Sequence, residues 1–208
     1  MTHKKFDRSK LSIRPLSERR NQISIEKSAV PLTAKASVLK EDVKDLIKRT
    51  ADKISNARNK NRSVILAFGA HTIKNGLAPV LIELIKRGWI THLATNGAGI
   101  IHDWEFAYQG MSGEDVRENV KKGQFGIWED TGRFINLALV AGAYEGLGYG
   151  ESIGKMISTE GLEIPEAPLL AEEARENIGK DPGHSAATLD FYSTITVNNI
   201  KPGFLNIP

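Results

Sequence analysis

Two short apolar segments joined by a helical segment constrain the fold of this chain most strongly. The first segment, residues 63–68, contains β-branched side chains and lies between charged residues and Gly69, a pattern typical of a buried parallel strand. Residues 77–87 then place apolar side chains at helical spacing, and residues 89–95 form the second apolar segment. A strand, a loop, a helix and a strand in this order predict a right-handed parallel βαβ unit.

Helical patterns dominate the rest of the chain. Residues 41–57 carry an apolar face and begin with two acidic residues, which favours an amphipathic helix. Residues 191–197 are compatible with a third strand. Further helices are expected over 100–109, from Ser112 as N-cap through Val120, over 134–145 with Thr131 as its cap, over 151–158 and over 167–178.

The polar character of residues 1–36 separates them from the rest. Their few apolar side chains bury little surface, so we expect an extended arm that lies across the body or across a neighbouring subunit. Residues 37–208 are predicted to form a single α/β domain. Two strands with a doubtful third are few for a doubly wound sheet, so we expect the sheet to be incomplete at the C-terminus, with strands from beyond this chain or from a partner completing it.

Composition excludes several classes of function. The 208 residues hold 28 basic and 25 acidic side chains, and a net charge of +3 without a basic cluster predicts no nucleic-acid partner. The chain has no cysteine, which excludes disulfides and thiolate chemistry. No apolar run reaches the roughly 18 residues that span a bilayer, and no signal peptide is recognisable, so we expect a cytoplasmic protein without a membrane partner.

The loops that follow the two predicted strands are the expected ligand site. Ligands of open α/β sheets bind beyond the carboxyl ends of the strands, and the loops there are residues 69–76 and 96–103. Their glycines allow close approach to the backbone, and a helix N-terminus near Asn75 and Gly76 would offer N–H groups to an anion. The spacing is not that of a dinucleotide fingerprint, a Walker motif, a nucleophile elbow or a zinc-protease motif.

Four ionisable side chains in these loops are the catalytic candidates. His71 would orient a substrate or act as an acid or base, or would serve only as a hydrogen-bonded structural residue. Lys74 would pair with a phosphate or carboxylate, or would simply be solvated. His102 and Asp103, with Glu105 nearby, offer metal ligands in principle, but adjacent helical residues point in different directions. We therefore expect no metal site.

The two loops also resemble a known family. Residues 68–77 read Phe-Gly-Ala-His-Thr-Ile-Lys-Asn-Gly-Leu, residues 91–103 read Thr-His-Leu-Ala-Thr-Asn-Gly-Ala-Gly-Ile-Ile-His-Asp, and both resemble the deoxyhypusine-synthase-like family over roughly residues 60–160. The resemblance implies a Rossmann-like parallel sheet flanked by helices, which binds NAD or FAD. The matching stretch of the synthases contacts NAD and a polyamine, and Asp103 matches its last acid. The cofactor-binding residues expected on this basis and from the first loop are Gly69, Asn75, Gly76, Thr95, Asn96, Gly97, Ala98 and Gly99.

Two departures from the synthases set the expected function. Ile101 and His102 stand where the synthases have glutamates, which removes negative charge that a polyamine would need. The glycine-rich segment with the synthases' catalytic lysine is absent, so the imine route has no nucleophile. We expect an NAD-binding, homo-oligomeric enzyme of a separate branch, transferase-like or oxidoreductase-like, that acts on a small polar substrate. The alternative is a non-catalytic ligand-binding or assembly protein; hydrolysis with His71 or His102 as base ranks last.

Overall fold

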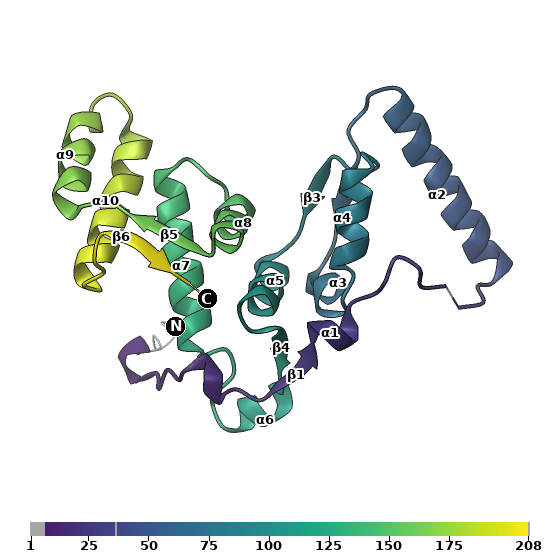
Figure 1. Cartoon of the computed structure of the whole chain (residues 1–208), viewed down its shortest axis with the longest axis horizontal. Coiled ribbons are helices and arrows are strands. Elements are labelled where there is room, and N and C mark those ends of the chain that lie inside the picture. Colours follow the sequence, from purple (N-terminus) through teal and green to yellow (C-terminus); the bar gives the residue numbers. More distant parts are fainter. Residues whose placement is uncertain (1–6, 36, 208) are drawn as a thin grey trace, which may run out of the picture. The chain divides into compact units, whose positions relative to one another are not determined.

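The computed structural model describes residues 7–35 and 37–207 as a mixed α/β chain that is mostly helical (Figure 1). The strands among these residues form three two-stranded sheets. Strand β1 (Asn21–Ser24) pairs with β4 (Met111–Glu114), β2 (Ile65–Ala67) with β3 (His92–Ala94), and β5 (Gly161–Ile164) with β6 (Gly203–Asn206). The chain divides into two compact units. Unit 1 comprises the described residues up to Gln22, Ala107–Gln109 and the described residues from Glu114 onward, and unit 2 comprises Ile23–Phe106 and Gly110–Gly113.

Unit 2 contains the predicted βαβ segment. Strands β2 (Ile65–Ala67) and β3 (His92–Ala94) pair in parallel, with Leu66 opposite Leu93. The connection between them holds α3 (Ala70–Lys74) and α4 (Ala78–Lys86), and the proline of α4 lies in its first turn, where a missing N–H costs nothing. The prediction of a parallel βαβ segment is confirmed, although both strands are shorter than predicted.

The parallel sheet does not extend beyond this pair in the described residues. The Rossmann-like sheet that we expected is therefore not seen, and the remaining strands pair elsewhere. Strands β1 (Asn21–Ser24) and β4 (Met111–Glu114) form one of the other sheets. The structure therefore supports a mixed α/β chain with small two-stranded sheets.

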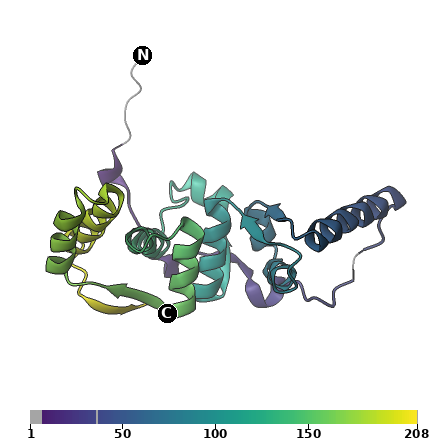
Figure 2. The same ribbon diagram turned by 90° about the horizontal axis from the view of Figure 1, so that it is seen from above.

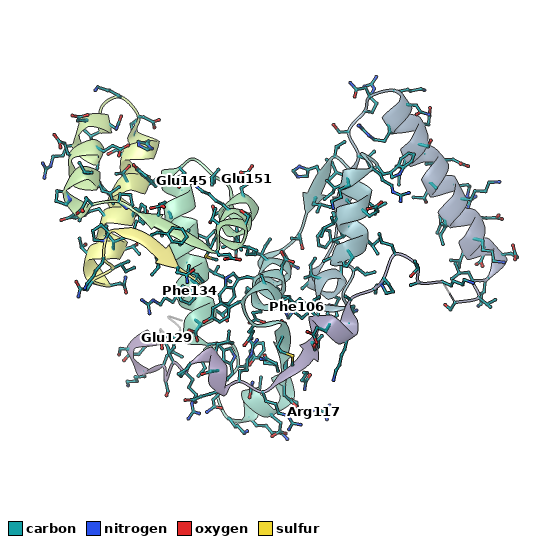
Figure 3. The ribbon with its side chains drawn as sticks, viewed as in Figure 1. Phe106, Arg117, Glu129, Phe134, Glu145 and Glu151 are labelled. Atoms are coloured by element: carbon teal, nitrogen blue, oxygen red, sulfur yellow. The ribbon has the colours of Figure 1, made fainter. Side chains whose placement is uncertain are left out.

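Unit 2 contains several helices besides the β2–β3 pair. They are the short α1 (Ile25–Ser28), the long α2 (Glu41–Asn59), α3, α4 and α5 (Gly97–Gln109). The core of this unit gathers Ile73, Leu81 and Phe106, and Leu66 and Phe68 from the β2 region pack against them. Figure 3 labels Phe106, whose side chain comes from α5. The end of β2 is thus packed against the apolar core of unit 2.

Unit 1 is a helical assembly with one antiparallel sheet. Buried side chains of its helices and of β5 form the core, among them Leu137, Met156, Leu162, Leu170 and Phe191. Helices α9 (Ala167–Asn177) and α10 (Pro182–Val197) run side by side as a hairpin (Figures 1 and 2). The elements are η1 (Arg8–Lys10), η2 (Leu16–Glu18), α6 (Val116–Lys121), α7 (Glu129–Tyr144), α8 (Tyr149–Thr159), β5 (Gly161–Ile164), α9 (Ala167–Asn177), α10 (Pro182–Val197) and β6 (Gly203–Asn206).

Three sequence predictions about local structure are wrong. Residues 191–197 belong to α10 and not to a strand, because Phe191 and Ile195 lie one helical turn apart and both enter the core. Ser112 is no N-cap, since it lies in β4 and Asp115 accepts the capping hydrogen bond from the Glu118 N–H. Thr131 lies inside α7, which begins at Glu129.

Part of the predicted N-terminal arm contributes side chains to the packing of the units. In unit 1, Leu16 is almost completely buried and its N–H donates to the Asp130 carboxylate at 2.7 Å. In unit 2, Ile23 and Ile25 pack against the core, and the Val30 N–H donates to the Gly76 carbonyl at 2.9 Å. No helix in the described part of the chain is long and apolar enough to cross a membrane.

Candidate functional site

The two predicted ligand loops begin next to each other at one edge of the β2–β3 pair. The strands are parallel, so their carboxyl ends lie at the same edge, and the Phe68 N–H continues the pairing by donating to the Ala94 carbonyl at 2.9 Å. Beyond this point β2 leads through Gly69 into α3, and β3 leads through Thr95 and Asn96 into α5. Two strand-to-helix turns therefore open toward the same space, as expected for a ligand-binding edge.

Of the two helix N-termini at this edge, that of α5 is the better suited to bind an anion. The Asn96 side chain caps it by accepting a hydrogen bond from the Gly99 N–H at 3.0 Å, and its first turn holds no acidic residue. The N–H groups of Gly97 and Ala98 have no acceptor within the helix, and the dipole of this three-turn helix favours negative charge in front of them. This end of α5 can therefore hold an anion such as a phosphate.

The glycines of the two loops differ in what surrounds them. A Cβ atom on Gly69 would meet no other atom within 4 Å, so the backbone there faces open space. Gly76 is buried with a φ of +78°, and a Cβ on it would overlap the Ser28 carbonyl. A Cβ on Gly99 would lie 2.6 Å from the Thr95 hydroxyl. Gly69 is thus the glycine that leaves room for a ligand, Gly76 is required by packing against backbone, and a side chain at Gly99 would have to displace the Thr95 side chain.

The first-loop candidates lie on and after α3. His71 is exposed on this short helix, and Asn75 is exposed where the helix ends. Lys74 is half-buried, and its Cε atom lies 3.7 Å from where a Cβ on Gly113 would stand. The aliphatic part of Lys74 therefore packs on β4. The predicted helix start near Asn75 is displaced, because α4 begins at Ala78.

His102 belongs to a buried polar cluster that the sequence did not predict. Its Nδ1 atom lies 2.7 Å from the Ser112 hydroxyl on β4, and that hydroxyl donates to the Glu105 carboxylate at 2.6 Å. Ser112 is 0% exposed and Glu105 is 1% exposed. The spacing of His102 and Glu105 places both on one helical face, which was the only available signal, because the pairing of Ser112 with them is a tertiary contact.

Asp103 follows His102 by one residue, about 100° further round α5, and its side chain retains solvent contact. Partial burial nevertheless raises the pKa of Asp103 above its ordinary value. The structure thus separates the two second-loop candidates: His102 joins Ser112 and Glu105, whereas Asp103 points to another side of the helix. Within the described residues, no group of three or more histidine, aspartate or glutamate side chains is placed to hold a metal ion.

Unit 1 holds a cavity of about 690 Å³ that the sequence did not reveal. Apolar side chains such as Ile13, Trp128 and Val140 line it, together with polar groups such as Arg133 and Asn136. Its volume lies within the range of small-molecule sites. Its lining comes from neither of the two glycine loops, so it is separate from the sheet edge.

Unit 1 has a polar cluster of its own, which joins three helices. Tyr144 of α7 donates its hydroxyl hydrogen bond to Glu173 of α9 at 2.8 Å, and His184 Nε2 of α10 lies 2.7 Å from the same carboxylate. The hydrogen bonds from His184 and then Tyr144 lower the pKa of Glu173 below its usual value. Burial, followed by the hydrogen bond to Glu173, raises the pKa of Tyr144. This cluster holds the α9–α10 hairpin against α7.

The sheet edge of unit 2 therefore combines anion-binding N–H groups, an open backbone position at Gly69 and a histidine linked to a buried carboxylate. These groups suit the binding of a phosphate-containing ligand and the transfer of a proton.

A scan of protein-family models, a search of curated proteins and a search of solved structures each found no match to this chain.

Proposed function

We propose that unit 2 binds NAD at the carboxyl edge of the β2–β3 pair, and that the protein is an NAD-dependent enzyme that acts on a small polar substrate. The proposal treats the β2–β3 pair as the centre of a Rossmann-like arrangement and the chain as a member of a deoxyhypusine-synthase-like branch. The observation that carries it is the parallel pairing through Phe68 and Ala94, which brings both glycine loops to one edge. The resemblance of both loops to that family agrees with it.

The pyrophosphate group of NAD fits the groups at this edge. Its oxygens would accept hydrogen bonds from the Gly97 and Ala98 N–H groups at the start of α5. Gly69 would let the neighbouring loop approach it, because no atom fills the space in front of that glycine. Lys74 lies half-buried in the same unit and would add positive charge. Bound NAD would supply a hydride acceptor, and the chain would supply the orientation and the proton transfer.

The substrate is proposed to differ from that of the synthases. The synthases present glutamates to a polyamine, and this chain has Ile101 and His102 at those positions. A half-buried isoleucine offers no charge to an ammonium group. The absent lysine segment removes covalent imine formation, so the proposed chemistry is oxidoreductase-like, with a small polar substrate that carries little positive charge.

A substitution at the start of α5 tests the proposed cofactor site. Ala98→Glu places a carboxylate on an exposed residue of the first turn, where negative charge stabilises the helix but repels phosphate. At a separation of about 5 Å the repulsion is about 1–3 kcal/mol, which lowers NAD affinity roughly fivefold or more. Calorimetric titration with NAD, supported by the fluorescence of the unit 2 tryptophans, measures the change.

Two matched variants serve as controls. Ala98→Gln has nearly the same size without the charge, and Ala51→Glu adds the same charge on an exposed face of α2. Both should bind NAD more tightly than Ala98→Glu does. The proposal fails if the wild-type protein shows no heat and no fluorescence change with millimolar NAD, or if all three variants bind equally.

A second candidate function is a self-assembling protein without catalysis. It is favoured by the exposed apolar face of α2, where Leu46 and Ile47 are each more than half exposed, and by Ile65 of β2, which is 65% exposed although strands of parallel sheets are normally covered. Sedimentation would then give a multiple of the 22.9 kDa chain mass. Leu46→Glu should shift the mass to that of the monomer, whereas Asn56→Glu on the same helix should not. A monomer at all concentrations removes this candidate.

A further inference from the structure

We infer that the unit 1 cavity binds a zwitterionic small molecule, an α-amino acid with an apolar side chain. Its carboxylate would pair with Arg133, its ammonium group would pair with Glu129, and its side chain would lie against the apolar part of the wall. The inference goes beyond the proposed function, because the residues that line the cavity belong to unit 1 and not to the sheet edge of unit 2.

One side of α7 forms the largest part of the cavity wall. The residues that this helix contributes recur every three or four positions and therefore share one helical face; they are Glu129, Gly132, Arg133, Asn136, Leu137 and Val140. The N-terminal segment adds Leu11 and Ile13, and the end of α10 and the residues after it add Thr194, Asn198 and Ile200. The wall is therefore built from three separate parts of the chain.

Main-chain hydrogen bonds fix the N-terminal segment at this wall. The Arg14 N–H donates to the Ile127 carbonyl at 3.0 Å, and the Glu129 N–H donates to the Arg14 carbonyl at 2.8 Å. The side chain of Arg14 pairs with Glu18 at 3.1 Å, and the Asp130 carboxylate accepts a backbone N–H of the same segment at 2.7 Å. These neighbouring charges are therefore engaged elsewhere and do not line the cavity.

Two exposed side chains of opposite charge do line it. Glu129 lies at the N-terminal end of α7 (Figure 3), and Arg133 follows one helical turn later. This spacing allows an ion pair, but neither side chain has a hydrogen bond or an ion pair within the described part of the chain. The Arg133 guanidinium lies 5.7 Å from the centre of the Phe134 ring, a contact that leaves its N–H groups able to donate to a ligand.

The opposite signs of these charges select the class of ligand. A ligand with only a carboxylate would be attracted by Arg133 and repelled by Glu129, and a ligand with only an ammonium group would meet the reverse. An α-amino acid carries both groups on one carbon atom at neutral pH, so both side chains gain a partner, with the guanidinium suited to bind the carboxylate by two hydrogen bonds. An exposed pair between the two side chains themselves would be weak enough for such a ligand to replace.

The wall next to the charged pair has room for the body of the ligand. A Cβ atom on Gly132 would meet no other atom within 4 Å, although a glycine inside a helix makes the helix less stable than an alanine would. Leu137 and Val140 follow further along α7 and are apolar. The ligand backbone would therefore lie over Gly132, and its apolar side chain would extend toward Val140.

A titration of the full chain with three related compounds tests the inference. L-phenylalanine carries both charges, 3-phenylpropionate lacks the ammonium group and 2-phenylethylamine lacks the carboxylate. In NMR spectra, the shifts should fall on the Gly132 and Asn136 amides and on the Trp128 indole N–H. L-phenylalanine should bind about fivefold more tightly than either analogue. The inference is overturned if millimolar L-phenylalanine shifts none of these signals, or if either analogue binds as tightly.

Variants that remove one charge separate the two contacts. Arg133→Gln should weaken the binding of L-phenylalanine about fivefold without weakening that of 2-phenylethylamine. Glu129→Gln should weaken the binding of L-phenylalanine without weakening that of 3-phenylpropionate. Arg117→Gln, at an exposed position of α6 outside the cavity (Figure 3), is the matched control and should change none of these affinities. Equal effects of Arg133→Gln and Arg117→Gln would contradict the inference, and if a variant fails to fold, the three compounds still decide with the wild-type protein.

Discussion

The contrast between Gly69 and Gly76 gives a sharp test of how the site is built. The sequence presents both as ligand-loop glycines, but the structure separates them. Gly76 has a φ of +78° and its missing side chain would overlap the Ser28 carbonyl. Gly69 has φ −94° and ψ 172°, an extended conformation open to any residue, and it faces open space. Replacement by alanine should therefore lower the stability of the protein at Gly76 and weaken ligand binding at Gly69.

The expected magnitudes differ enough to measure. A left-handed conformation costs alanine about 1–2 kcal/mol, and the overlap with the Ser28 backbone adds about 1–3 kcal/mol because a carbonyl cannot rotate away as a side chain can. Gly76→Ala should thus lower the free energy of unfolding by about 2–5 kcal/mol. For Gly69→Ala, the poorer capping by alanine is offset by a less flexible unfolded chain, so the net change should stay within about 1 kcal/mol.

Denaturation in guanidinium chloride, followed by circular dichroism, measures both stabilities, and calorimetry measures NAD binding by the folded variants. Gly69→Ala should remain folded and bind NAD about tenfold more weakly or worse, because its methyl group occupies the space proposed for the cofactor. A Gly76→Ala variant as stable as the wild type would refute the packing of Ser28 on this glycine. Unchanged NAD affinity in Gly69→Ala would refute a close approach of ligand to that backbone.

Two further predictions concern unit 1. Hydrogen bonding, first from His184, keeps the pKa of Glu173 below its ordinary value of 4.5. The stabilising contribution of Glu173 is therefore present above that pH and is lost as the pH falls through the lower folded-state value. In denaturation curves, Glu173→Gln should be less stable than wild type near neutral pH, and the difference should shrink as the pH falls below 4.5. Gly142→Ala should lower the unfolding free energy by about 1–3 kcal/mol, because its methyl group would overlap the Ser152 side chain of α8. Gly154→Ala should raise stability slightly, because no atom lies close to that glycine and alanine favours the helix. Equal melting temperatures for the two variants would contradict this packing.

Local patterns predicted much of the secondary structure but not the sheets. The βαβ segment, α2 and α9 could be predicted because apolar periodicity and the residues of the first helical turn are local signals. Residues 191–197 misled because β-branched residues and aromatics also fit a helix whose face is buried, as Phe191 shows. Local propensity gave way there to tertiary packing. The extended parallel sheet was inferred from resemblance, and the described residues do not contain it.

The candidate site, too, could be predicted from the sequence only in part. The edge after β2 and β3 was predictable, because the order of strand and helix fixes where parallel strands end. The link from His102 through Ser112 to Glu105 was not, because Ser112 resembled a helix cap and only the fold brings β4 beside α5. The different surroundings of Gly69 and Gly76 were equally hidden, since they depend on Ser28, a residue of the predicted arm.

Amide NMR of the full chain during a titration with NAD tests the central proposal most directly. If NAD binds at the carboxyl edge of the β2–β3 pair, the largest shifts should fall on the backbone N–H groups of Gly69, Ala70, Gly97 and Ala98. Saturation should occur at the affinity that calorimetry gives. Shifts confined to the residues that line the unit 1 cavity, or no shifts at millimolar NAD, would contradict the proposal.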